Sequence, residues 1–146
     1  MTLLLTCIIN SVLVAIAVWV HYSILYRIVK VLPVFHFAHS VRIVFGVFGA
    51  LIAHIIEIWI FALGFFLMAK HGQLGSLSGN FDGSLLDCVY FSFTVYTTVG
   101  FGDIEPLGYI RFLAGIASLT GLVLITWTAS FLYLEMQRHW EKDRYQ

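Results

Sequence analysis

Three long apolar stretches constrain the fold of this chain more than any other feature of its sequence. They cover about residues 3–25, 43–69 and 108–135 of the 146 residues, and each exceeds the roughly 20 residues that a helix needs to cross a bilayer. Hydrophobic residues make up 60% of the chain, against about 45–50% in an ordinary soluble domain. The sequence therefore predicts an all-α membrane protein with three transmembrane helices, organised as a single membrane domain over residues 1–146.

A fourth apolar stretch, residues 84–97, is too short to cross a membrane. Ser84 followed by Asp87 fits a capping box, which predicts a helix that begins at this serine. A helix of this length would enter the membrane, end near Thr97 and place the partial negative charge of its C-terminus in the middle of the bilayer. We therefore predict a re-entrant helix over residues 84–97.

The segment after this short helix has an unusual composition. From Thr97 to Asp103 it reads Thr-Thr-Val-Gly-Phe-Gly-Asp, which is poor helix material. Gly100 and Gly102 tolerate positive φ, so the carbonyl oxygens of residues 98–101 can all point the same way. Rings of carbonyl oxygens can replace the water around a dehydrated monovalent cation. The backbone of this segment is therefore a candidate cation-binding site.

In its helix–segment–helix frame, this stretch resembles the selectivity filter of potassium channels, with Phe101 where tyrosine is commoner. The resemblance covers residues 43–135 and implies an outer helix, a pore helix (84–97), a filter (98–102) and an inner helix (108–135). It implies a homotetramer, because one chain supplies only one strand of a filter. It also implies passive K⁺ conduction, with K⁺ as the permeant ion and the only metal, and no cofactor. The K⁺-binding residues would be Thr98, Val99, Gly100, Phe101 and Gly102, with Asp103 at the filter mouth.

The third apolar stretch carries two further candidates. Gly121 lies at the depth where related channels often have a hinge, although small residues equally permit close packing of another helix. Beyond it, Ile125, Ala129 and Tyr133 lie on one stripe of the predicted helix. Such a stripe is a candidate inner constriction that gates by dewetting.

His54 and Glu57 are unexpected residues in the second stretch, because an ionisable side chain within a membrane is costly and often functional. One interpretation is structural: Glu57 bonds Ser92, Tyr96 or a hydroxyl group of the third span, and we favour it because buried polar groups usually find partners. The other is a protonation switch that tunes pore opening. The face that carries Glu57 is expected to pack against protein, since it also carries three small residues, Gly46, Ala50 and Ala53.

Charge predicts the orientation of the chain. Arg27, Lys30 and Arg42 lie between the first two spans, and further basic residues follow the third. The positive-inside rule then places the linker and the C-terminus in the cytoplasm, and the N-terminus and filter mouth outside. The membrane would be the plasma membrane, or the inner membrane of a bacterium. A cleaved signal peptide is the alternative, but the first span lacks a basic n-region.

Residues 1–42 are predicted to be an additional transmembrane helix followed by a basic, aromatic linker. We expect this linker to begin near His21, to lie at the membrane interface and to kink at Pro33. Anionic lipid would contact Arg27, Lys30 and Arg42.

Several other functions receive little support from the sequence. A formal net charge of zero argues against nucleic-acid binding. The sequence shows no nucleophile–base pair, no metal-spaced His/Cys set and no phosphate loop, so we expect no enzyme; Cys7 and Cys88 stand alone in apolar settings. The alternatives are a less selective monovalent cation channel, a non-conducting regulatory membrane subunit and a secondary transporter. A transporter would be expected to show inverted repeats with broken helices.

Overall fold

Four helices and two short strands make up the part of the chain, residues 2–31 and 39–144, that the computed structural model describes. The three long helices are α1 (Thr2–Val31), α2 (His39–His71) and α4 (Ile110–Arg144). They contain apolar spans of 29, 31 and 28 residues, long enough to cross a membrane by length and composition. The prediction of an all-α membrane protein with three transmembrane helices is therefore confirmed. Each helix is longer than its apolar stretch, since good helix formers such as Lys, Arg and Glu continue it at the polar ends.

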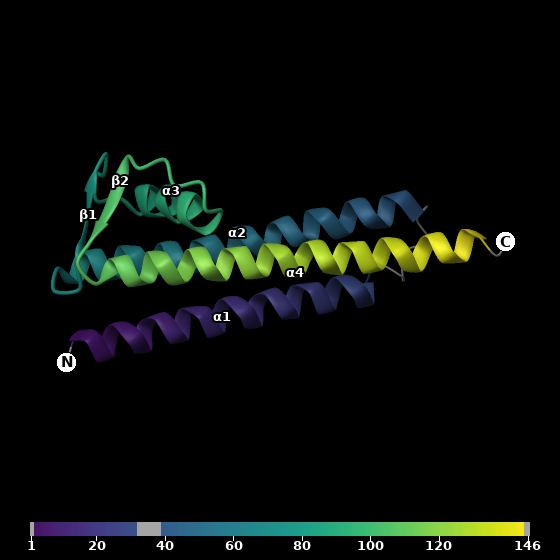
Figure 1. Ribbon diagram of the computed structural model, residues 1–146, viewed down its shortest axis with the longest axis horizontal. Coiled ribbons are helices and arrows are strands. Elements are labelled where there is room, and N and C mark those ends of the chain that lie inside the picture. The colour runs from purple at the N-terminus through teal and green to yellow at the C-terminus, as the bar shows by residue number, and fades with distance from the viewer. Residues whose placement is uncertain (1, 32–38, 145–146) are drawn as a thin grey trace.

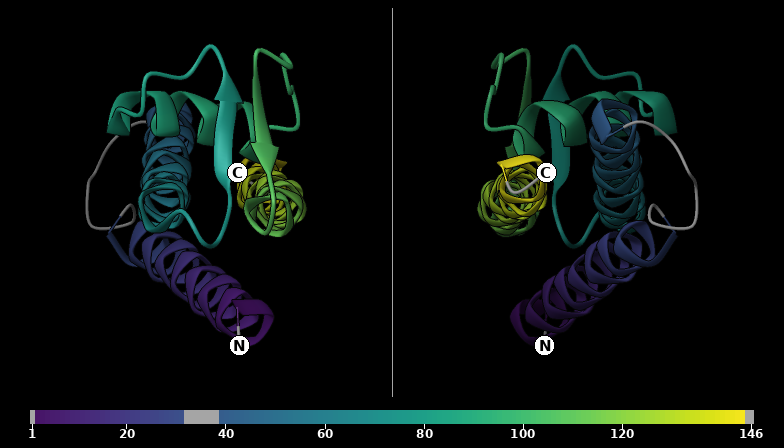
Figure 2. Two further views of the ribbon diagram at one scale, coloured as in Figure 1. Left: turned by 90° about the vertical axis from the view of Figure 1, so that its left-hand side faces the viewer. Right: turned by 90° about the vertical axis from the view of Figure 1, so that its right-hand side faces the viewer.

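The short helix α3 (Leu85–Tyr96) lies against α2 and α4. Figures 1 and 2 place α1 on the opposite side of α2 and α4 from α3. In Figure 1 the N-terminal end lies at the same end of the bundle as the strands, and the C-terminal end lies at the other. This arrangement puts α3 and the residues that follow it at one end of a three-helix bundle.

The core of the bundle consists of aromatic and aliphatic side chains from α2, α3 and α4. Phe65 and Phe91 meet edge to face, with ring centroids 4.9 Å apart, and both are buried. Leu113 and Ala117 of α4 are fully buried beside them in the same cluster. Because lipid is as apolar as these side chains, close packing rather than exclusion of water holds such helices together.

Helix α1 packs closely on α2 at two glycines. A β-carbon on Gly64 would lie 2.6 Å from Cδ1 of Leu13, and one on Gly49 would lie 2.6 Å from Cδ1 of Ile28. Small residues permit this approach of two helices within a membrane. The first helix is therefore an integral part of the bundle.

A two-stranded antiparallel sheet is an addition to the predicted all-α fold. Strand β1 (Ser76–Gly79) pairs with β2 (Ile104–Leu107), and Gly79 lies opposite Ile104. The Ser- and Gly-rich sequence of β1 does not predict a strand. Pro106 is tolerated in β2 because both strands of a two-stranded sheet are edge strands. The sheet joins the loop before α3 to the residues that follow the candidate filter.

The predicted beginning of the interfacial linker was wrong. Helix α1 continues to Val31, so His21 lies within a helix and is fully buried. Arg27 and Lys30 are exposed on the last turns of α1, and Lys30 Nζ lies 4.5 Å from the centre of the Tyr26 ring. Pro33 and its predicted kink lie outside the described residues.

Candidate functional site

The candidate site begins at the two ends of α3. Ser84 is its N-cap and accepts a hydrogen bond from the Asp87 amide at 3.1 Å, and Thr97 is its C-cap, so the predicted helix is confirmed. The capping box is only half formed: the Asp87 carboxylate accepts from the Asp82 amide at 2.8 Å rather than from Ser84. The Ser84 amide instead donates to the Asp82 carboxylate at 2.7 Å. Both aspartates thus fix the loop that enters α3.

The backbone after α3 alternates in conformation. Thr98, Gly100 and Gly102 have φ angles of 62°, 52° and 79°. Thr98 is the one non-glycine residue with positive φ among the described residues. A threonine in this region carries strain of about 1–3 kcal/mol, and such strain is concentrated at functional sites. Both glycines adopt the positive φ that carbonyl groups aligned on one side would require.

Hydrogen bonds hold this segment on the last turn of α3. The Thr98 amide donates to the Val95 carbonyl at 3.0 Å, and the Gly100 amide donates to the Thr94 carbonyl at 3.0 Å. The Thr97 hydroxyl donates to the Phe93 carbonyl at 2.7 Å. The position of the segment therefore depends directly on the position of α3.

A second set of contacts holds the far end of the segment. The Phe101 ring stacks on the Tyr90 ring at 11° between planes, with centroids 6.4 Å apart. The Tyr90 hydroxyl donates to the Asp103 carboxylate at 2.9 Å. Asp103 thus bonds back toward α3. In the single chain, Val99 and Phe101 are more than half exposed.

A buried polar cluster lies behind α3, where side chains from all four helices meet. Glu57 of α2 is fully buried, and its Oε1 lies 2.8 Å from Nδ1 of His21 on α1. Its Oε2 lies 3.0 Å from Nδ1 of His54 and accepts a hydrogen bond from the Tyr96 hydroxyl of α3. Thr128 Oγ1 of α4 lies 3.0 Å from Nε2 of His54 and 3.4 Å from Nε2 of His21. Glu57 therefore joins three helices directly.

The contacts of Glu57 agree in part with its predicted structural role. Tyr96 is a partner, as expected, whereas Ser92 donates to the Ile58 carbonyl at 2.8 Å. The small residues on the same face of α2 are buried, as expected. Sequence reasoning missed His21, because the polar and aromatic residues after it favoured a linker. The one sequence signal for its role was that a lone histidine lies near the end of the first apolar stretch, residues 3–25.

Gly121 touches the end of α3, where a β-carbon would lie 2.1 Å from the Tyr96 carbonyl oxygen. This contact favours the close-packing interpretation of the glycine over the hinge, which remains untested. The predicted constriction residues lie further along α4 and are exposed in the single chain: Ile125, Ala129 and Tyr133.

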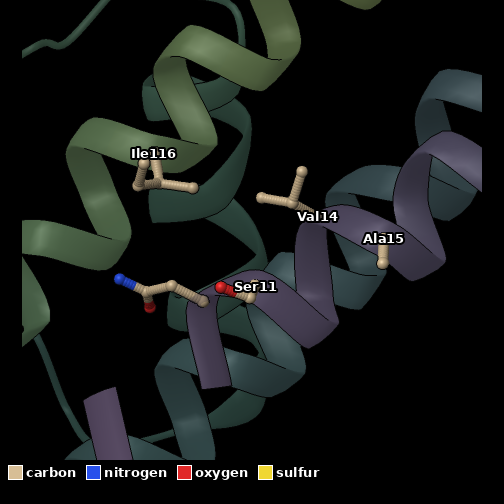
Figure 3. A pocket seen from close by; sticks show the side chains of 5 residues that line it. Ser11, Val14, Ala15 and Ile116 are labelled. Carbon is tan, nitrogen blue, oxygen red and sulfur yellow. The ribbon is translucent and has the colours of Figure 1, made fainter. Parts of the chain in front are cut away.

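A separate hollow lies between α1 and α4 (Figure 3). Ser11, Val14 and Ala15 of α1 line it, together with Asn10 and with Ile116 of α4. The Oδ1 atom of Asn10 is buried and has no hydrogen-bond partner among the described residues. Asn10 precedes His21 by 11 residues, or roughly 16 Å along the helix. The hollow is therefore distinct from the polar cluster.

Spanning helices with a short helix packed against them, followed by a segment with positive φ at alternate residues, are typical of channel-forming membrane proteins. The chain belongs to the ion channel family, whose sequence profile matches residues 47–138. The chain is also similar to the potassium channel protein kcv of Paramecium bursaria Chlorella virus 1, with 39% identity over 56 residues. This match covers 34% of the present chain and 60% of the viral protein. No solved structure matches the chain significantly. The protein is thus a multi-pass membrane protein of the ion channel family.

Proposed function

We propose that the protein is a potassium-selective channel whose filter is the backbone of residues 98–102. The observation that carries this proposal is the positive φ at three alternate positions, Thr98, Gly100 and Gly102, directly after a helix whose last residue is buried. Such a backbone can point successive carbonyl oxygens the same way, and carbonyl oxygens so arranged can substitute for the hydration shell of K⁺. The similarity to a viral potassium channel supports this choice of ion. K⁺ is then the permeant ion, and conduction needs no cofactor.

The functional unit in this proposal is a homotetramer, since one chain supplies one strand of the filter. The large apolar side chains exposed beside the segment and on α4 support an assembly, among them Val99, Phe101 and Tyr133. In this arrangement Ile125, Ala129 and Tyr133 line the inner constriction, and Gly121 is the candidate hinge. Asp103 lies at the filter mouth, where its bond to Tyr90 holds the outer end of the filter.

The proposed pore domain comprises residues 43–135, and residues 1–42 form the additional helix and the basic linker. The N-terminus and the loop before α3 face outside, and the C-terminus is cytoplasmic. Figure 1 supports this topology, because the N-terminal end and the strands lie at one end of the bundle and the C-terminal end lies at the other. Anionic lipid of the cytoplasmic leaflet then contacts Arg27, Lys30 and Arg42.

The experiment that tests the proposal is a reversal potential in planar bilayers that contain the purified protein, with K⁺ on one side and Na⁺ on the other. A reversal near the K⁺ equilibrium potential is the expected result. A reversal near zero with robust current would mean a less selective monovalent cation channel, and the absence of a hydroxyl group on Phe101 would be the first feature to test. Silence with stable, assembled protein at all pH values and voltages would favour a non-conducting subunit.

A further inference from the structure

We propose that His21, His54 and Glu57 form a binding site for a divalent transition-metal ion of the Zn²⁺ class. Imidazole nitrogens and a carboxylate oxygen are ordinary zinc ligands, and three of them leave a fourth position for water or another oxygen. One ligand atom from each of the three residues lies within 4.8 Å of the others. The residues come from α1 and α2, so the ion would connect the additional helix to the pore domain.

The two imidazole rings are oriented as metal ligands require. Each presents Nδ1 to Glu57, at 2.8 Å for His21 and 3.0 Å for His54. Each also presents Nε2 to Thr128 Oγ1, at 3.4 Å and 3.0 Å. When an ion takes both Nδ1 atoms, both Nε2 atoms carry hydrogen and can donate to this oxygen, which has two lone pairs. Thr128 is then the outer partner that a ligating histidine normally has.

The charge of Glu57 is the main reason for an ion at this place. Without a metal, the Thr128 hydroxyl can donate to one Nε2 atom and accept from the other, and Nδ1 of His54 also lies 3.0 Å from the Tyr96 hydroxyl. An ionised Glu57 buried in a membrane span still needs a compensating charge. A divalent ion supplies this charge with neutral rings. The Tyr96 hydroxyl, bonded to Oε2, orients the carboxylate.

Binding requires a rearrangement of the cluster. Metal–ligand bonds of about 2.0–2.1 Å place the ligands of a tetrahedral site roughly 3.3 Å apart. The two nitrogen–oxygen distances to Glu57, 2.8 and 3.0 Å, would lengthen. Wider separations, which reach up to 4.8 Å between the ligand atoms, would shorten. The ion has access on the side of His54, whose side chain is 14% exposed, while His21 and Glu57 are fully buried.

The test uses the purified full-length protein, treated with chelator and then titrated with Co²⁺ as a spectroscopic probe and with Zn²⁺ as a competitor. We expect one Co²⁺ per chain, with the intense visible absorption of low-coordinate nitrogen and oxygen ligation, and displacement by Zn²⁺. His21→Gln and Glu57→Gln should abolish the signal. His71→Gln is the matched control, since this histidine lies at the exposed end of the same helix as His54.

Thr128→Val keeps the shape of the side chain and removes the shared oxygen. It should weaken Co²⁺ binding by about 10–100-fold, the usual effect of losing an outer partner. If the ligand variants do not fold, Thr128→Val tests the metal site in their place. No saturable absorption in the unaltered protein, or binding that neither His21→Gln nor Thr128→Val changes, would overturn the metal site and leave a hydrogen-bonded ion pair. Because binding is read without current, this result is independent of whether the channel conducts K⁺.

Discussion

Gly121 and Tyr96 are in direct contact: a β-carbon on the glycine would lie 2.1 Å from the carbonyl oxygen of the tyrosine and 3.0 Å from its ring. Tyr96 is the last residue of α3, and the candidate filter begins two residues later. The middle of α4 therefore supports the end of the helix that holds the filter. Movement of α4 at this point would act on the filter through a contact that has no space for compression.

Replacing Gly121 with alanine should destabilise the protein. The added methyl group overlaps backbone rather than a flexible side chain, and overpacking of this kind typically costs about 1–3 kcal/mol or more. The matched control is Gly115→Ala on the same helix, where a β-carbon meets no atom within 4 Å. Thermal unfolding of the assembled protein measures both. Unchanged stability with altered open probability in Gly121→Ala would instead favour the hinge.

Replacing Gly100 or Gly102 with alanine should abolish K⁺ selectivity. In the single chain a β-carbon meets no atom within 4 Å at either position, so the effect comes from φ angles of 52° and 79° that alanine rarely adopts. Gly72→Ala is the control, because its φ is 63° and it also has open space, but it lies at the end of α2. Reversal potentials under K⁺/Na⁺ gradients measure the difference. Normal selectivity in both filter variants would remove residues 98–102 from the permeation path.

Glu57→Gln should lower stability substantially. The carboxylate lies against Nδ1 of His21, Nδ1 of His54 and the Tyr96 hydroxyl, which donates to it. An amide group would replace one of its two acceptor oxygens with an N–H donor and disturb at least one of these contacts. Breaking a buried pair by changing one partner typically costs about 3–5 kcal/mol. Glu105→Gln, an exposed position, is the control for thermal unfolding. A stable variant whose open probability loses its pH dependence would support the protonation switch, whereas an unchanged pH profile supports the structural role.

The hydrogen bond between Tyr90 and Asp103 should contribute about 0.5–1.5 kcal/mol. Tyr90→Phe removes the donor and keeps the ring that stacks on Phe101, and Asp103→Asn removes the charge of the acceptor. A double-mutant cycle on thermal stability isolates the pair, and its coupling energy should be positive. Strictly additive effects of the two substitutions would show that the bond does not stabilise the outer end of the filter.

Stability should fall on acidification because of the loop before α3. Hydrogen bonds from the Ser84 side chain and backbone amide lower the pKa of Asp82 below its ordinary value of 3.8. A group with a lowered pKa contributes stability above its unfolded-state pKa and loses it as the pH falls through the folded-state pKa. Thermal unfolding from pH 7 to about 3 should therefore decline less steeply in Asp82→Asn. Identical slopes would remove Asp82 from the acid response.

Much of this structure follows from short-range features of the sequence. The three spans follow from apolar length, the ends of α3 from Ser84 and Thr97, and the positive φ of Gly100 and Gly102 from the absence of a β-carbon. Each of these features depends on a few neighbouring residues, so it can be recognised without knowing the rest of the fold. The family membership rests on the same local pattern in its helical frame.

The contacts between helices were decided by the tertiary structure. His21 and Glu57 are 36 residues apart, and His21 and Thr128 are 107 apart, so no local pattern connects them. Gly79 and Ile104, which pair β1 with β2, are 25 residues apart, as are Tyr96 and Gly121. In a membrane, lipid and protein interior are similarly apolar, so hydropathy does not show which face of a span meets another helix. The sequence by itself therefore determined the helices and the backbone of the candidate filter, and only close packing decided which polar side chains meet between them.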